Sequence, residues 1–111
     1  MRDARTRKIQ ERLEGLYDSI ALSAQNVLLN PVGSDVRGFL TAMKNEFEGP
    51  RRNLAVPSTL EALANALGSN LDERQRAIQL AQAVVRDRDK LKAVLAKLNP
   101  QARAVEGASP N

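Results

Sequence analysis

The spacing of the apolar residues constrains this chain most, because it follows the period of a helix. In residues 4–29 an apolar side chain recurs at steps of four or three residues, which places one apolar face along a helix. Aromatic residues make up only 3% of the sequence, whereas β-strands favour aromatic and β-branched side chains. The sequence therefore predicts an all-α fold. The residues of this first stripe are Ile9, Leu13, Leu16, Ile20, Ala24 and Val27.

Turn and capping residues separate the first helix from a second, shorter one. Pro31 and Gly33 end the first helix, because proline cannot continue the helical hydrogen-bond ladder. Ser34 then offers an N-cap, and Asp35 suits the positive end of the next helix dipole. Residues 49–50, Gly-Pro, end the second helix. We also expect the charged first two turns of the first helix to be solvated and to project beyond the core.

Two further capping patterns predict a short third helix and a long fourth one. Ser58 and Glu61 have the spacing of a capping box, so the third helix begins near Thr59. It ends at Gly68, which we expect in the left-handed conformation. Asn70 is the predicted N-cap of a fourth helix that runs to about residue 98, before Asn-Pro at 99–100.

These elements predict a small helical bundle of about four helices, two long and two short. Residues 1–99 are expected to form a single helical domain, since the length suits one core. Residues 100–111 have small and polar side chains without capping signals, and we expect a flexible C-terminal tail there.

The stripe of the last helix is interrupted at its middle. Apolar residues repeat every seven positions from Ala77, but the layer between Val84 and Leu91 is Asp87 and Arg88. One interpretation is a solvated break in the pattern, and the other is a polar layer that sets the register of an oligomer.

Helical spacing also predicts where the charged side chains near this break pair. We expect Asp87 with Lys90 and Asp89 with Lys92 to form surface ion pairs. At the start of the same helix, four-residue spacing predicts a further pair between Asp72 and Arg76.

The absence of histidine and cysteine excludes most catalytic and metal-binding patterns. Ser-His-Asp and Cys-His arrangements need a base that this chain lacks, and thiolate metal sites need cysteine. The closest glycine pair, Gly33 and Gly38, lacks the Gly-Lys-Ser/Thr ending of a phosphate-binding loop. We therefore expect a protein that is not an enzyme and that has no catalytic residues, no cofactor and no metal site.

Assembly through helix contacts is the leading functional prediction. Two short helices are too short to cover the apolar stripes of two long ones, so apolar surface should remain for copies of this chain or for other protein subunits. The sequence contains no apolar run long enough for membrane insertion and no secretion signal, so we expect an unprocessed cytoplasmic protein or a part of a soluble macromolecular assembly. The candidate interface residues are Tyr17, Leu28, Val84, Asp87, Arg88 and Leu91.

The alternative is a nucleic-acid-binding module, which the net charge of +4 permits. The run Leu-Ala-Asn-Ala-Leu-Gly at 63–68 resembles the first helix and turn of a helix-turn-helix motif, within residues 58–80. The resemblance implies that the next helix reads the major groove and turns Arg74 and Arg76 toward DNA. Arg51 and Arg52, in the loop after Pro50, are then candidates for phosphate contacts.

Overall fold

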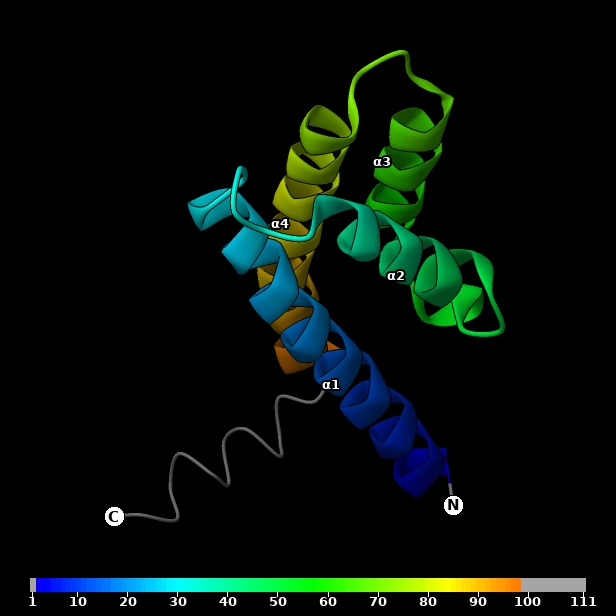
Figure 1. Cartoon of the computed structure of the whole chain (residues 1–111). Coiled ribbons are helices and arrows are strands. Elements are labelled where there is room, and N and C mark those ends of the chain that lie inside the picture. The colour runs from blue at the N-terminus through cyan, green and yellow to red at the C-terminus, as the bar shows by residue number, and fades with distance from the viewer. Residues whose placement is uncertain (1, 99–111) are drawn as a thin grey trace.

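The computed structural model describes residues 2–98, which form four α-helices and one short 3-10 turn (Figure 1). These residues contain no strand, so the predicted all-α fold with two long and two short helices is confirmed. The tail predicted at residues 100–111 lies outside the described part of the chain. In chain order the elements are α1 (Arg2–Leu29), α2 (Val36–Glu48), η1 (Arg52–Leu54), α3 (Pro57–Gly68) and α4 (Glu73–Leu98).

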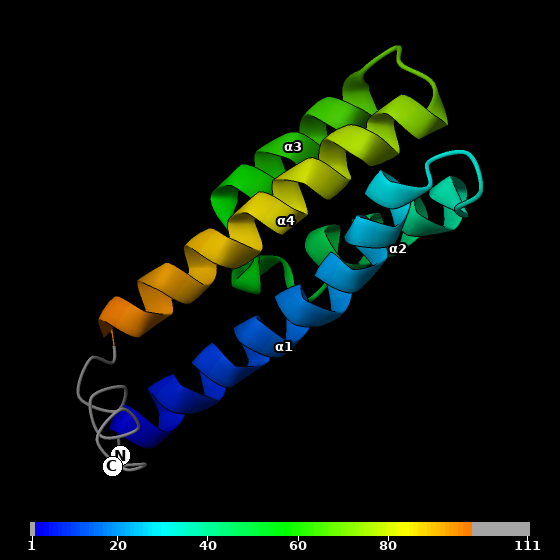
Figure 2. The same ribbon diagram turned by 90° about the vertical axis from the view of Figure 1, so that its left-hand side faces the viewer.

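The helices are arranged in two layers of unequal length. The long helices α1 and α4 lie antiparallel and share the most extensive contact, while α2 and α3 lie behind them in a second layer (Figure 2). The second layer covers the C-terminal half of α1 and the N-terminal half of α4 and leaves the other halves bare. We call the covered part the head, and the two-helix extension, residues 2–16 and 90–98, the arm.

The core of the head forms where stripes from all four helices meet. The rings of Tyr17 from α1 and Phe47 from α2 pack with their centroids 5.9 Å apart. Leu63 of α3 and both Leu80 and Val84 of α4 are buried against them. The periodic apolar positions identified in the sequence thus become one continuous core in this half of the molecule.

The N-cap of α2 differs from the predicted one by a single residue. Asp35, and not Ser34, is the cap, and its carboxylate accepts a 2.9 Å hydrogen bond from the backbone N–H of Gly38. The Ser34 hydroxyl instead donates to the backbone oxygen of Asn26 at 3.1 Å, which ties the connection back to the end of α1. Both residues are therefore used, but in exchanged roles.

The bounds of α3 lie within two residues of the predicted ones, but the capping predicted at each end is wrong. The helix begins at Pro57, whose missing N–H suits the first helical position, and no side chain caps it at Val56. The Ser58 hydroxyl points to α4 and does not form a capping box with Glu61. At the other end, Gly68 is the last helical residue and does not adopt the left-handed conformation.

A capping box does occur at the start of α4, two residues after the predicted Asn70. The Asp72 carboxylate accepts a 2.8 Å hydrogen bond from the N–H of Gln75, and the Gln75 side chain accepts one of 3.4 Å from the N–H of Asp72. This reciprocal pattern satisfies two backbone donors at the first turn, so the helix begins at Glu73.

Candidate partner interface

Asp87, the acid that interrupts the stripe of α4, is buried in the head with 1% of its surface exposed. The Ser58 hydroxyl donates to its Oδ1 at 2.7 Å, and the Thr59 hydroxyl donates to its Oδ2. The predicted surface ion pair with Lys90 and the solvated interpretation are therefore wrong for Asp87. A buried carboxylate needs such donors, and the first turn of α3 supplies them.

Tyr17 extends this polar network to α1. Its hydroxyl donates to Thr59 Oγ1 at 3.3 Å and accepts a 2.7 Å hydrogen bond from the backbone N–H of Val56. Burial raises the pKa of the Tyr17 hydroxyl, although the hydrogen bonds with Thr59 and Val56 act in the opposite direction. The network thus links α1, α4 and the beginning of α3 at one level of the head, where the head gives way to the arm.

Arg88, the second polar residue of the interruption, pairs with α1. Its Nε donates to Asp18 Oδ1 at 2.8 Å, and the Lys92 ammonium lies 3.4 Å from the same oxygen. The predicted pair of Asp89 with Lys92 is wrong, since Lys92 contacts Asp18 and Asp89 lies 3.6 Å from Arg88. The hydrogen bond from Arg88 holds the pKa of the Asp18 carboxyl below its usual value, and Lys92 adds to the effect.

The six residues predicted for a partner interface lie mainly inside the chain's own fold. Tyr17, Val84 and Asp87 are fully buried in the head, and Leu91 is buried between α1 and α4. Leu28 is partly buried against the core, and Arg88 is held by Asp18. The surface that is accessible to a partner therefore lies at other positions.

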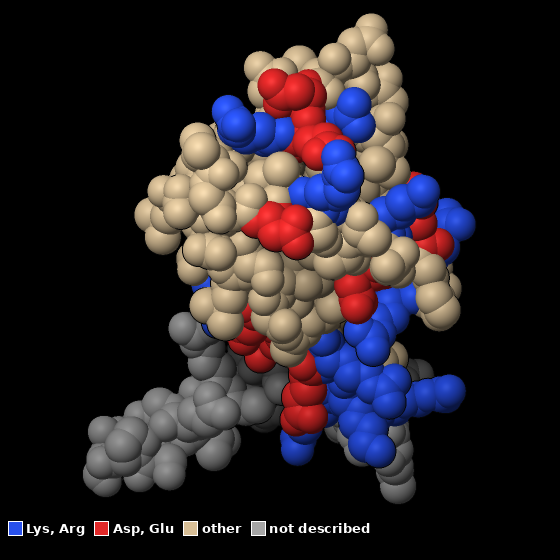
Figure 3. All heavy atoms as spheres, viewed as in Figure 1, with Lys and Arg blue, Asp and Glu red and all other residues tan. Residues whose placement is uncertain are grey.

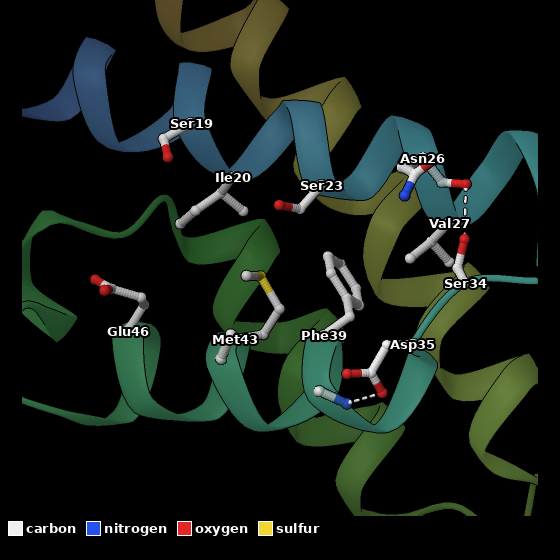
Figure 4. Close-up of a pocket in the computed structure, with 12 residues that line it drawn as sticks. Ser19, Ile20, Ser23, Asn26, Val27, Ser34, Asp35, Phe39, Met43 and Glu46 are labelled. Atoms are coloured by element: carbon white, nitrogen blue, oxygen red, sulfur yellow. Dashed lines mark hydrogen bonds between the residues drawn. The ribbon is translucent and has the colours of Figure 1, made fainter.

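A groove of about 410 Å³ separates α1 from α2 in the head (Figure 4). Its α1 wall carries Ser19 and Ser23, and the side chains of Phe39 and Met43 rise from α2 toward it. Asp35, which also lines the groove, is already engaged as the cap of α2. The lining therefore combines hydroxyls and apolar groups with the capping carboxylate, the Asn26 amide and the Glu46 carboxylate.

A wider hollow of about 800 Å³ continues this groove toward the arm. Arg12, Gly15 and Leu16 line it from α1, and Arg51 and Leu54 line it from the segment after α2. Arg51 pairs with Glu46 at 2.9 Å, so its charge is partly neutralised on the head side, while Arg12 faces the hollow from the arm side.

The arm exposes apolar side chains that the second layer would cover if it were longer. Ile9 is 45% exposed on α1 and Val94 is 51% exposed on α4, while Leu13 and Leu16 are only partly buried. Spacing of four and three residues places Ile9 on the stripe that reaches Ile20, which lines the groove beside α2. We define the open face of the arm as Ile9, Leu13, Leu16 and Val94.

Basic side chains border this open face on both helices. Three exposed cations of α1, at positions 5, 8 and 12, follow the same three- and four-residue steps beside the apolar stripe. Lys90 and Lys97 are exposed on α4, four residues before and three after Val94. Lys and Arg gather over the N-terminal half of α1 in the space-filling view (Figure 3). The α1 border consists of Arg5, Lys8 and Arg12.

The four arginines of the nucleic-acid alternative are not brought together. Arg51 and Arg52 precede α3, whereas Arg74 and Arg76 follow it, so the two pairs lie at opposite ends of that helix. Arg76 donates to the backbone oxygen of Leu71 at 2.6 Å and does not form the predicted ion pair with Asp72. In addition, α3 and α4 lie side by side and antiparallel, whereas the helices of a helix-turn-helix cross at about 90–120° (Figures 1 and 2).

No family model, curated protein or solved structure matches the chain. None of the helices within residues 2–98 is long and apolar enough to cross a membrane. In the same residues, acidic side chains do not gather in groups of three or more that could hold a metal ion. The exposed apolar residues Ile9 and Val94 and the basic residues beside them make the open face of the arm the candidate interface.

Proposed function

We propose that this protein is a non-catalytic assembly subunit or adaptor that acts through helix-mediated contacts with other protein chains. The contacts are made by the open face of the arm, in the cytoplasm or within a soluble macromolecular assembly. The observation that supports this function is the exposure of Ile9 and Val94 at opposite sides of one two-helix surface. Copies of this chain and other subunits are both partners of the required class.

Covering the open face would be favourable by the same mechanism that stabilises the head. Burying apolar surface contributes roughly 25 cal/mol per Å², so a helix that covers Ile9 and Val94 gains on the order of 1 kcal/mol from each. Leu13 and Leu16, which are already partly buried, would add to this. The arm has the antiparallel geometry of a half-finished bundle, and one or two helices from outside would complete it.

Site-specific photocrosslinking tests the proposal on the full chain in its native extract. A photoreactive phenylalanine analogue replaces Ile9 or Val94 in two variants and Leu22 in a third, since Leu22 is 70% exposed on a different face of α1. We expect discrete adducts with a protein chain from positions 9 and 94 and none from position 22. Equal labelling from all three positions, or no protein adduct from the arm, would show that the open face is not an interface.

Light scattering on the purified chain separates the two kinds of partner. A defined multimer, lost in the Ile9→Glu variant, would identify the partner as another copy of this chain. A monomer that still gives arm-specific adducts in the extract would identify a different subunit.

A further inference from the structure

We infer that the open face of the arm receives a helix with an apolar face flanked by acidic residues, supplied by a different protein. The inference rests on the proposed function and names the chemistry of its partner. It follows from three features of the arm. These are the uncovered surface of α1 and α4, the basic residues that border it, and the positions of the acidic residues of the arm.

The uncovered surface has the length of a short helix. In the head, α3 lies against α4 at the level of Asp87, and beyond Pro57 the layer continues only as the short segment before α3, whose Arg51 and Leu54 line the hollow with Arg12 and Leu16. The part of α1 that borders the open face, residues 5–16, is roughly 18 Å long at 1.5 Å per residue. A partner helix of about three turns therefore matches the length of the open face and would extend the layer that α3 begins.

Positive charge borders the open face of the arm on both helices. On α1, Arg5 and Arg12 are the neighbours of Ile9 at four- and three-residue spacing, and on α4, Lys90 and Lys97 are the neighbours of Val94. These four side chains are exposed. A helix seated between them meets cations along both of its edges, so acidic residues beside its apolar face are favoured by charge complementarity.

Two described acidic side chains of the arm, Glu11 and Glu14, are directed away from these borders. Glu11 lies two residues from Ile9 on α1, and a two-residue step on a helix points to nearly the opposite side. Glu14 lies two residues from Leu16 and is directed away for the same reason. Asp18, at the base of the arm, is occupied by Arg88 and Lys92. The borders of the open face are therefore cationic and available to a partner.

These charges disfavour the other occupants. A second copy of the chain would bring the same cations to the same face, so like charges would meet across the contact. Nucleic acid would pair with the cations through its phosphates but would leave Ile9 and Val94 in water. A membrane surface is flat, whereas the exposed apolar residues Ile9 and Val94 lie on two different helices and each is only about half exposed.

Selection from a randomised helix library measures which residues the open face prefers beside the apolar face of a bound helix. The probe is the outer helix of a stable three-helix scaffold, with leucine fixed at positions i, i+3, i+4 and i+7 and with each flanking position varied among Glu, Lys, Gln and Ala. A folded scaffold removes the folding cost of an isolated short helix. The library is selected on the full chain and counter-selected on the double variant Ile9→Glu, Val94→Glu.

We expect glutamate to be enriched at the flanking positions, and the selected binders to lose about tenfold or more in affinity to an Arg12→Glu, Lys90→Glu variant. Repeating the selection on that charge-reversed variant should enrich lysine instead. Equal recovery of Glu and Lys, or binders that do not distinguish the chain from its Ile9→Glu, Val94→Glu variant, would overturn the inference. The matched control is Leu22→Glu, which should leave the selection unchanged and, like the other variants, retain the parent's circular dichroism.

Two further probes address the competing classes of partner. A duplex DNA fragment and vesicles of equal parts phosphatidylcholine and phosphatidylserine are tested at the same salt concentration. Tighter binding of either probe than of the selected helices, unaffected by Ile9→Glu and Val94→Glu, would replace the inferred partner. Arm-specific protein adducts together with neutral or basic selected flanks would overturn this inference and leave the proposed function standing, whereas absence of arm-specific adducts would count against the proposed function itself.

Discussion

The head and the arm are built from the same two long helices and differ only in what lies beside them. In the head, α2 and α3 cover the stripes of α1 and α4, and residues such as Leu80 and Val84 are completely buried. In the arm, the stripes continue at the same spacing, but α1 and α4 have only each other, and Ile9 and Val94 stay about half exposed. The contrast teaches that helix length, and not a change in pattern, decides where core ends and surface begins.

Charge follows the same division. In the head, exposed arginines meet acids from neighbouring segments, as in Arg51 with Glu46 and Arg37 with Glu73. On the open face of the arm, exposed cations border the apolar stripe on both helices. Some arginines of the head are thus paired within the chain, while the cations that border the open face would be complemented by acidic residues of a partner.

Truncating one apolar residue in each region should give the largest difference between them. Leu80→Ala removes a fully buried side chain and should lower the free energy of unfolding by about 2–5 kcal/mol. Val94→Ala removes a half-exposed one and should lower it by less than about 1 kcal/mol. Urea denaturation followed by circular dichroism measures both. Similar losses for the two variants would mean that the arm is as well packed as the head.

The buried acid of the head supplies the second comparison. Asp87→Ala leaves the hydroxyls of Ser58 and Thr59 without their acceptor and should cost roughly 2–3 kcal/mol. The neighbouring exposed carboxylate gives the matched control, since Asp89→Ala should change stability by less than about 0.5 kcal/mol. If the Asp87 variant unfolds at the same urea concentration as the control, the network does not hold the head together.

Much of this fold could be predicted because periodicity and helix stops are local signals. The helix bounds near Leu29, Glu48 and Leu98 follow from proline and glycine positions that the sequence displays directly. The excess length of the two long helices was also visible, and it led to the prediction of uncovered apolar surface. The sequence did not show which part of the long helices stays exposed, because that depends on where α2 and α3 pack against them.

The tertiary contacts of polar residues could not be predicted in the same way. Ser58 matches a capping box in sequence, yet a carboxylate 29 positions later in the chain takes its hydroxyl. Asp87 was predicted to pair with Lys90 on the surface, because helical spacing identifies neighbours on the same helix and not on a facing one. The one available signal was an acid in the middle of an apolar stripe, which calls for hydroxyl or amide donors from a facing helix. Ser58 and Thr59 are adjacent hydroxyls at a helix start, and together with Asp87 they could have suggested this contact.

Two glycines inside helices offer a smaller test. Gly15 has open space beside it, whereas Gly38 lies against the Asp35 carboxylate. A Cβ at Gly15 would meet open space at the boundary of head and arm, so Gly15→Ala should raise the free energy of unfolding by about 0.5–1 kcal/mol. A Cβ at Gly38 would collide with the Asp35 carboxylate that caps α2, and displacement of a cap costs about 1 kcal/mol. Gly38→Ala should therefore gain nothing or destabilise. An equal gain in thermal unfolding from both substitutions would show that the Asp35 cap contributes little.

Asp18 gives the smallest expected effect, and it tests the junction between the two regions through pH. Because Arg88 lowers the pKa of this carboxyl, its ion pairs stabilise the fold above the usual aspartate pKa of about 4. This stabilisation is lost as the pH falls through the lowered pKa of the folded state. Since Asp18 is half exposed, Asp18→Asn should cost less than about 1 kcal/mol at neutral pH. Urea denaturation at a series of pH values should show the wild type and Asp18→Asn converging at the acid end, whereas a constant difference would mean that Asp18 acts through packing and not through its charge.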